Sequence, residues 1–206
     1  TPVMILNKKN LALVSILCVT IGTISYSQET GSLTDSRDGH EYKTVKIGDQ
    51  WWMSENLAYK ADKGCLVYEG VDRYLETYGY LYTWETALTV CPEGWHLPSD
   101  AEYEKLSNFL GGYAASGGKL KATGTILWES PNTDATNSSG FAALPAGYNG
   151  SEAYQVFIGK MAYFWSYDET VEDAEIARAL YFNKGEFTRY MIDRSNGLSV
   201  RCMKDL

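Results

Sequence analysis

The chain contains 206 residues and carries a formal net charge of -8 at pH 7. An acidic chain repels phosphate backbones and anionic lipid, so nucleic acid and a charged membrane surface are excluded as expected partners. The length is sufficient for one domain with a sizeable hydrophobic core.

Residues 1–27 have the pattern of a secretory signal peptide. The basic segment Asn7–Asn10 precedes an uncharged apolar run over Leu11–Ile24, and Ser25 and Ser27 place small residues before a cleavage point at Gln28. The apolar run, about 14 residues, is shorter than the ~20 residues that a membrane span requires. We therefore expect cleavage rather than a membrane anchor, with residues 1–3 as upstream read-through.

Cys18 raises the alternative of a lipoprotein. A lipid-modified cysteine follows a small residue, whereas Leu17 precedes Cys18, and Cys18 lies in the middle of the apolar run. We interpret it as an ordinary signal residue. Residues 28–37 are polar and lack periodicity, which predicts a flexible leader, and residues 38–206 are expected to form a single domain. The mature protein is expected to be secreted or held at the cell surface, with the periplasm as an alternative.

The first predicted element of the domain is a β-hairpin. Tyr42–Ile47 carries β-branched residues typical of a strand, a Gly-Asp turn follows, and Gln50–Met53 forms the second strand. Residues 56–79 have weak periodicity, which predicts a long loop. Apolar residues spaced by three and four predict a short helix over residues 80–90.

The strongest helix prediction begins at Ser99. Ser99 and Glu102 form a capping box, in which each side chain satisfies a backbone amide of the other residue. Apolar side chains through Leu110 then share one helical face, and Gly111-Gly112 ends the helix by permitting left-handed backbone.

The second half of the chain predicts short strands separated by turns. Residues 128–140 are rich in Asn, Ser and Pro, which is typical of a surface loop. The predicted strands cover Met161–Tyr167, Ala174–Phe182, Phe187–Ile192 and Leu198–Met203. Helices early and strands late make an α+β pattern.

Several ordered blocks carry a resemblance to a known family: Tyr42–Leu57, Tyr78–Trp84, Cys91–Asp100, Gly117–Lys121, Gly140–Tyr148 and Ser199–Cys202. Together they resemble the Fibrobacter succinogenes major paralogous domain family, over residues 38–205. The resemblance implies an exported protein of Bacteroidetes-like bacteria and a C-type lectin-like fold, similar to the branch of formylglycine-generating enzymes. The expected fold has one or two helices in the first half and several short antiparallel strands in the second.

Of the four cysteines, Cys18 belongs to the signal, which leaves Cys65, Cys91 and Cys202. The odd count leaves at least one thiol over. In an exported chain we expect a disulfide between Cys91 and Cys202, joining the strand before the long helix to the last strand. Closing so long a loop is worth about 4 kcal/mol in the chain-entropy model. Cys65 is expected to stay free, because the second cysteine that family members often have in that region is missing.

Catalytic constellations are absent from the sequence. Formylglycine-generating enzymes use two closely spaced cysteines near the C-terminal end, where this chain has only Cys202. His40 and His96 are the only histidines, so a three-histidine iron site cannot form, and His96 is expected to be a hydrogen-bonded structural residue. We assign no catalytic residue, no cofactor and no metal.

The ligand-binding surface is expected over residues 128–167. Asn132 and Asp134 offer oxygen ligands for calcium, but the Glu-Pro-Asn and Gln-Pro-Asp triplets of sugar-binding C-type lectins do not occur, so no ion is assigned. The chain contains 16 Tyr and 6 Trp, side chains that combine a large rigid face with a polar tip. The candidate ligand-binding residues are Trp128, Asn132, Asp134, Tyr148, Tyr154 and Tyr163.

The sequence therefore predicts an exported, non-enzymatic binding module that recognises a glycan or an extracellular protein at the bacterial surface. Two alternatives stay open. One is an enzyme of the formylglycine-generating-like branch that uses a free cysteine, either Cys65 or Cys202. The other is a structural part of a surface assembly.

Overall fold

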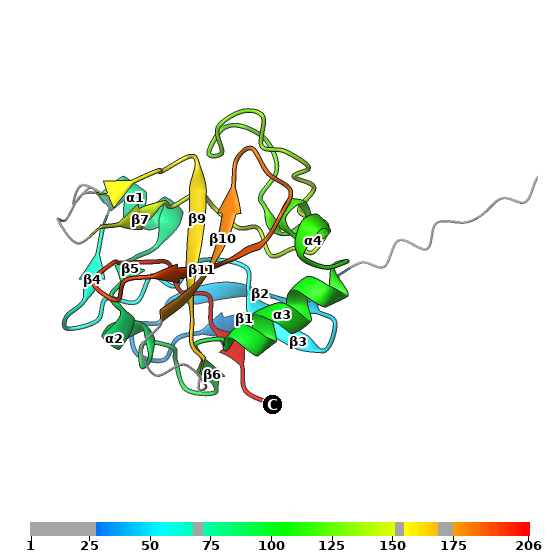
Figure 1. Ribbon diagram of the computed structural model, residues 1–206. Helices are drawn as coiled ribbons and strands as arrows, with labels where there is room; N and C mark the ends of the chain where they lie inside the picture. Colours follow the sequence, from blue (N-terminus) through cyan, green and yellow to red (C-terminus); the bar gives the residue numbers. More distant parts are fainter. Residues whose placement is uncertain (1–27, 68–71, 151–154, 169–174) are drawn as a thin grey trace, which may run out of the picture.

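The computed structural model of the chain describes residues 28–67, 72–150, 155–168 and 175–206. The signal peptide expected over residues 1–27 and the candidate residue Tyr154 lie outside these ranges. Within them the fold is mixed α and β, with four helices and mostly antiparallel strands in open sheets (Figure 1). The elements are β1 (Thr30–Thr34), β2 (Glu41–Ile47), β3 (Gln50–Met53), β4 (Cys65–Leu66), α1 (Asp72–Tyr78), β5 (Leu81–Tyr82), α2 (Trp84–Ala87), β6 (Trp95–His96), α3 (Asp100–Phe109), α4 (Tyr113–Leu120), β7 (Tyr148–Asn149), β8 (Gln155–Val156), β9 (Met161–Ser166), β10 (Glu175–Tyr181), β11 (Thr188–Ile192) and β12 (Met203–Lys204).

The largest sheet has five strands in the order β1-β2-β3-β12-β6. The predicted hairpin of β2 and β3 is confirmed, with Val45 opposite Trp52 and a turn at Gly48, whose φ of 65° is accessible to glycine at little cost. The last strand, β12, inserts between this hairpin and β6. The two ends of the domain therefore meet in one sheet.

The prediction of a flexible leader over residues 28–37 is wrong. Thr30–Thr34 forms β1, which pairs antiparallel with β2 from Thr30 opposite Val45 to Thr34 opposite Glu41. Most of β1 is exposed, so backbone pairing at the sheet edge holds it in place rather than side-chain burial. Hydrophobic periodicity cannot reveal a strand of that kind.

The helix beginning after Ser99 is confirmed, including its capping box. The Ser99 hydroxyl accepts a hydrogen bond from the Glu102 amide at 3.3 Å, and the Glu102 carboxylate accepts one from the Ser99 amide at 2.8 Å. The helix runs to Phe109, and Gly111 and Gly112 follow with φ of 101° and 86°. Both glycines adopt the left-handed region expected after a helix.

Three predictions around this helix are corrected. The long loop expected over residues 56–79 contains β4 and α1, and the helix expected over residues 80–90 is divided between β5 and the shorter α2. The helix α4 was not predicted, because its sequence includes Ser116, Gly117 and Gly118, which are weak helix formers. Tertiary packing fixes these elements where local propensity does not.

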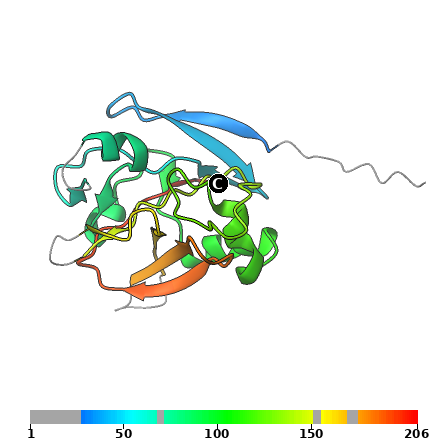
Figure 2. The same cartoon turned by 90° about the horizontal axis from the view of Figure 1, so that it is seen from above.

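The second main sheet has the order β11-β10-β9 and confirms the three strands predicted between Met161 and Ile192. Figure 2 shows β10 and β11 on the side of the molecule opposite β1 and β2. Asp100 at the start of α3 holds one face of this sheet. Its carboxylate accepts hydrogen bonds from Arg178 Nε at 2.9 Å and Arg189 Nε at 2.8 Å.

The strand expected over Leu198–Met203 is only partly present. Only Met203 and Lys204 form a ladder strand, whereas Leu198 and Ser199 make single bridges to Tyr82 and Phe164. The chain there threads between the two main hydrophobic clusters, one around Trp165 and the other around Trp52. No helix among the described residues is long and apolar enough to cross a membrane.

Candidate functional site

The predicted disulfide is present and joins the middle of the chain to its C-terminal segment. Cys91 and Cys202 are bonded, with their Cα atoms 5.9 Å apart and 111 positions between them in the sequence. Cys202 is fully buried. The pair therefore fastens the segment before β6 to the segment before β12, and its thiols are not available for catalysis.

His96 is a structural residue, as predicted. Its Nδ1 lies 2.6 Å from Asp205 Oδ1, and its Nε2 lies 3.1 Å from Glu102 Oε1. Glu102 is the same side chain that caps α3. The hydrogen bond with Glu102 raises the pKa of His96, and the bond with Asp205 adds to this shift. His96 thus links the start of α3 to the C-terminal segment.

Arg201 is a buried hub that sequence reasoning did not identify. Its Nε donates to Asn56 Oδ1 at 2.6 Å, and its other nitrogens donate to the carbonyl oxygens of Met53 at 3.1 Å and Ala142 at 3.0 Å. Burial lowers the pKa of Arg201 to about 9. Ser199–Cys202, the last of the blocks that carry the family resemblance, therefore helps to hold the fold together through Arg201.

Two of the candidate ligand-binding residues are buried and serve the fold. Trp128 is 1% exposed, and its indole N–H donates to the Ala143 carbonyl at 3.0 Å. Asn132 is 6% exposed, and its amide donates to the carbonyls of Ala122 and Gly124 at 3.0 Å and 2.8 Å. These contacts hold the 128–140 loop from inside, so both side chains are buried rather than exposed on its surface.

A buried lysine completes the anchoring of this loop. Lys121 Nζ donates to the carbonyl oxygens of Thr133, Tyr181 and Lys184 at 2.7 to 2.9 Å. Burial lowers the pKa of Lys121 to about 8. One side chain thus joins the loop to the end of β10 and to the turn that follows it, and the sequence offered no signal that this lysine points inward.

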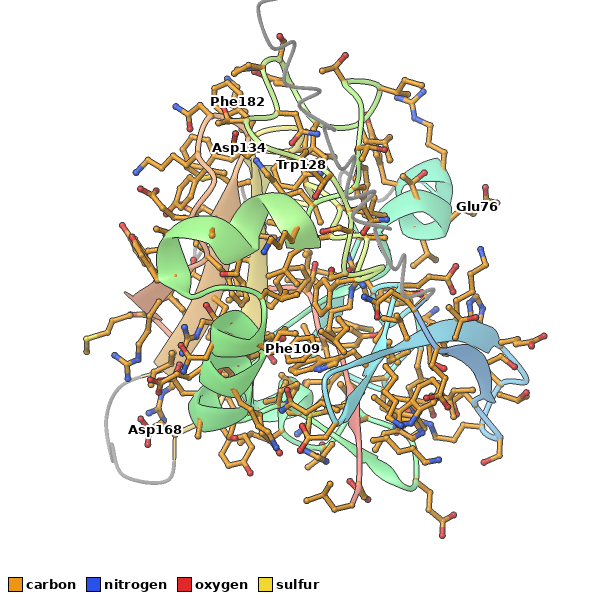
Figure 3. The ribbon with its side chains drawn as sticks, turned by 90° about the vertical axis from the view of Figure 1, so that its right-hand side faces the viewer. Glu76, Phe109, Trp128, Asp134, Asp168 and Phe182 are labelled. Atoms are coloured by element: carbon orange, nitrogen blue, oxygen red, sulfur yellow. A yellow bond between two sulfur atoms is a disulfide. The ribbon has the colours of Figure 1, made fainter. Side chains whose placement is uncertain are left out.

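Asp134 is exposed and lies in the same loop as Trp128 and Asn132. Figure 3 shows Asp134 and Trp128 near Phe182, at the end of the molecule away from Asp168. Among the described residues, no group of three or more His, Cys, Asp or Glu side chains is placed to hold a metal ion.

Two other candidates meet in an aromatic cluster on the sheet of β9 to β11. The Tyr148 and Tyr163 rings are 5.4 Å apart, and Tyr163 also lies 6.4 Å from Tyr181 and 6.1 Å from Tyr190. Phe157 extends the cluster, 6.0 Å from Tyr148. We call these five residues the aromatic cluster. The rings meet mainly edge to face, a favourable arrangement for aromatic pairs.

The cluster is buried at its centre and open at its ends. Tyr163 is 5% exposed, whereas Phe157 is 45% and Tyr190 46% exposed. Tyr148 and Tyr181 are half-buried. Burial raises the pKa of Tyr163, whose hydroxyl donates to Met161 Sδ at 3.6 Å. The buried Tyr163 ring thus lies at the centre of the cluster, and Phe157 and Tyr190 are its two exposed members.

Phe157 has an unusual backbone. Its φ is 66°, in the left-handed region that bulky side chains rarely adopt. The turn that follows is closed by hydrogen bonds from the Lys160 and Met161 amides to the Phe157 carbonyl, at 2.9 Å and 3.0 Å. The surrounding structure therefore enforces a strained conformation that leaves an aromatic ring facing solvent.

Sequence reasoning found Tyr148 and Tyr163 but missed Phe157, Tyr181 and Tyr190. Alternation along each strand gives the residues that share a face, yet the register between strands is required to bring Tyr163, Tyr181 and Tyr190 together. Phe157 was hidden in a region without periodicity. Its exposure follows from the turn, not from the strand pattern.

A separate hollow of about 440 Å³ lies between α1 and the segment after β3. Glu41, Glu55 and Glu76 line it, and Figure 3 shows Glu76 on α1. Asn56 at its wall is already hydrogen-bonded to Arg201 and to the Tyr78 carbonyl. The polar groups of this hollow that are buried are thus committed to the fold.

The remaining cysteine, Cys65, is free and half-buried. Its thiol donates a hydrogen bond to the Ala61 carbonyl at 3.2 Å. This agrees with the expectation of a leftover thiol, and the contact is to backbone rather than to a catalytic base.

Comparison with known proteins gives one finding. The model of the Fibrobacter succinogenes major domain (Fib_succ_major) matches residues 45–204. Searches of curated proteins and of solved structures returned no significant match. The matched range runs from within β2 to the end of β12 and contains the sheet of β9 to β11, the disulfide and the aromatic cluster, whereas β1 lies before it. The chain therefore belongs to the Fibrobacter succinogenes major domain family.

Proposed function

We propose that the protein is an exported, non-enzymatic binding module that holds a glycan on the aromatic cluster. The observation that carries the proposal is Phe157, an exposed aromatic ring on left-handed backbone beside Tyr148. Such strain costs about 1–3 kcal/mol and is concentrated at functional sites, where the surrounding fold enforces it.

The side chains of the cluster match the chemistry of a sugar. A pyranose ring has an apolar face, which stacks on an aromatic ring, and a rim of hydroxyls, which hydrogen-bond to tyrosine hydroxyls. Phe157 and Tyr190 offer the two exposed faces, and Tyr148 and Tyr181 lie half-buried between them. Because rings on the sheet are held by their neighbours, little side-chain entropy is lost on binding.

Export and the fold type are part of the same proposal. The Cys91–Cys202 disulfide supports an oxidising compartment, because such bonds are rare in the cytosol. The signal pattern over residues 1–27 supports secretion or attachment to the cell surface. The mixed fold with antiparallel sheets supports a C-type lectin-like arrangement, which the family resemblance implies.

The enzyme alternative has less support than it had from the sequence alone. Cys202 is bonded to Cys91, so the nucleophile of that alternative is restricted to Cys65. The Cys65 thiol is hydrogen-bonded to a backbone carbonyl. Cys65 lies in β4, which pairs with β5 in a different sheet from β9, β10 and β11. We therefore favour binding over catalysis.

A screen of neutral oligosaccharides against the folded mature chain tests the proposal. We expect a bound sugar, and we expect Phe157→Ala with Tyr190→Ala to weaken its binding at least about tenfold, as loss of central aromatic contacts does. Phe109→Ala with Tyr113→Ala is the matched control. Those rings are 62% and 53% exposed on α3 and α4, and Figure 3 shows Phe109 on α3.

Calcium chelation belongs to the same experiment. We expect EDTA to leave the affinity unchanged, because the cluster consists of aromatic rings. Absence of any sugar ligand, equal loss in the control variant, or capture of a protein ligand instead would contradict the proposal.

A further inference from the structure

A second aromatic surface lies on the five-stranded sheet, on the other main sheet from the aromatic cluster. A hollow of about 110 Å³ opens there, and its lining comes from β1, β2, β3, β6 and β12. We call it the tryptophan groove; its residues are Gly31, Ser32, Thr44, Trp51, Trp95 and Lys204.

The strand order places a lysine between the two indoles. Met203 of β12 pairs with Trp52 of β3, and Lys204 pairs with Trp95 of β6. Strands β3 and β12 are antiparallel, and Trp52 lies opposite Met203. Trp51, the residue before Trp52, therefore lies opposite Lys204, the residue after Met203. Side chains directly opposite in a sheet share a face, so Trp51, Lys204 and Trp95 form one row.

The two tryptophans are half-buried, and Lys204 is exposed. They come from strands that are two positions apart, which separates their backbones by about 10 Å. Two consecutive sugar rings span such a distance. The groove therefore presents two aromatic supports and a cation between them.

Gly31 keeps the floor of the groove open. A Cβ at Gly31 would lie 3.1 Å from Thr44 Oγ1 and 3.5 Å from Cζ3 of Trp51. The Trp51 ring therefore reaches across β2 toward β1. Lys46 Nζ lies 6.0 Å from the centre of this ring, near the limit of a cation–π contact.

The charge of the groove differs from that of the whole molecule. The chain has a net charge of -8, yet two lysines lie on the strands that flank Trp51 of β3: Lys46 on β2 and Lys204 on β12. Lys46 is paired with Glu29 at 3.1 Å, whereas Lys204 makes no ion pair within the described part of the chain. A cation without a partner between two aromatic rings favours an anionic ligand with flat apolar faces.

We propose that the tryptophan groove binds an anionic polysaccharide built of uronic acid residues. Pyranose rings stack on Trp51 and Trp95, and a carboxylate of the chain pairs with Lys204. The proposal is independent of the aromatic cluster, because the two surfaces lie on different sheets and recognise ligands of different charge. A row of aromatic side chains across a sheet face suits an extended polymer rather than a compact metabolite.

Titration calorimetry with polygalacturonate tests the proposal, at low salt and at 0.5 M salt. We expect binding that weakens as salt rises, because surface charges are screened. Lys204→Gln should weaken binding about fivefold and reduce the salt dependence, and Trp95→Ala should weaken it about tenfold. Lys204 is exposed, so its variant keeps the fold, which circular dichroism verifies.

The matched control is Lys43→Gln, which makes the same charge change in the same five-stranded sheet. Lys43 is three positions from Lys46 in β2, so its side chain faces the opposite side of the sheet. We expect Lys43→Gln and the cluster variant Phe157→Ala to bind polygalacturonate like the unaltered chain.

Four outcomes would overturn the proposal: no binding of polygalacturonate, equal binding of a neutral polysaccharide, tighter binding of single-stranded DNA, or equal weakening by Lys43→Gln. The third outcome tests the class of polyanion, because aligned aromatic and basic side chains also suit single-stranded nucleic acid. None of these results bears on neutral sugars at the aromatic cluster.

Discussion

His96 shows how a single side chain connects distant parts of the chain. It bonds to Glu102, which caps α3, and to Asp205 near the C-terminal end. The side chain of His96 is 31% exposed, so these contacts are partly open to solvent and are worth about 1 kcal/mol or less. Their strength depends on the charge of the imidazole.

The stability of the domain should therefore depend on pH through His96. The folded-state pKa is raised above the usual value near 6.5, so the contribution is complete below about pH 6.5 and is lost as pH rises through the folded pKa. Urea unfolding at pH 5.5 and pH 7.5 measures the difference. We expect lower stability at pH 7.5, and a smaller difference for His96→Gln. An unchanged difference in the variant would show that other groups cause it.

At the scale of elements, local pattern predicted some segments and missed others for physical reasons. The hairpin of β2 and β3 and the capping box at Ser99 are encoded by a few adjacent residues, and both were predicted. The edge strand β1 is held mainly by backbone hydrogen bonds to β2, and α4 is rich in weak helix formers. Neither element therefore has a hydrophobic periodicity that can be recognised in the sequence. Tyr148 and Tyr163 were named as separate candidates, but the cluster that they form was not predicted, because the register between strands decides which tyrosines meet.

The glycines of α4 illustrate packing that overrides propensity. A Cβ at Gly117 would lie 2.5 Å from the carbonyl carbon of Glu186 and 2.6 Å from the oxygen of Gly185. Alanine has a helix propensity about 1 kcal/mol better than glycine. At Gly117 this gain in helix propensity is smaller than the free energy needed to move the backbone of Gly185 and Glu186, which follows β10.

Gly117→Ala should therefore destabilise the domain, by roughly 1–3 kcal/mol, the range typical of overpacking. Urea denaturation with circular dichroism measures the free energy of unfolding. Asn108→Ala, at an exposed position of α3, is the control and should be neutral or slightly stabilising. A stabilised Gly117→Ala variant would mean that α4 is not packed against the segment of Glu186.

At the scale of the whole molecule, the first and last strands of the domain belong to one sheet, and one disulfide ties the C-terminal segment to the segment before β6. β12 lies between β3 and β6, and the Cys91–Cys202 bond closes a loop with a sequence separation of 111. The identifying blocks of the sequence build this closure through Arg201, His96 and the cysteines. The binding surfaces that we propose lie elsewhere, on open parts of the two main sheets.

Removal of the disulfide tests the closure. Replacing Cys91 and Cys202 by Ala should lower the free energy of unfolding by about 4 kcal/mol, because the unfolded chain regains the entropy of a long loop. Guanidinium unfolding measures the loss, and Cys65→Ala is the control for removal of a free thiol. A loss below about 1 kcal/mol would show that sheet pairing alone closes the domain.

The central claim is that the aromatic cluster contacts the ligand. Aromatic-ring NMR signals, followed while the neutral oligosaccharide found in the screen is added, test it most directly. The account predicts shifts of the Phe157 and Tyr190 rings, with smaller shifts of Tyr148 and Tyr181, and unchanged signals from Trp51 and Trp95. Shifts confined to residues outside the cluster, with Phe157 and Tyr190 unaffected at saturation, would contradict it.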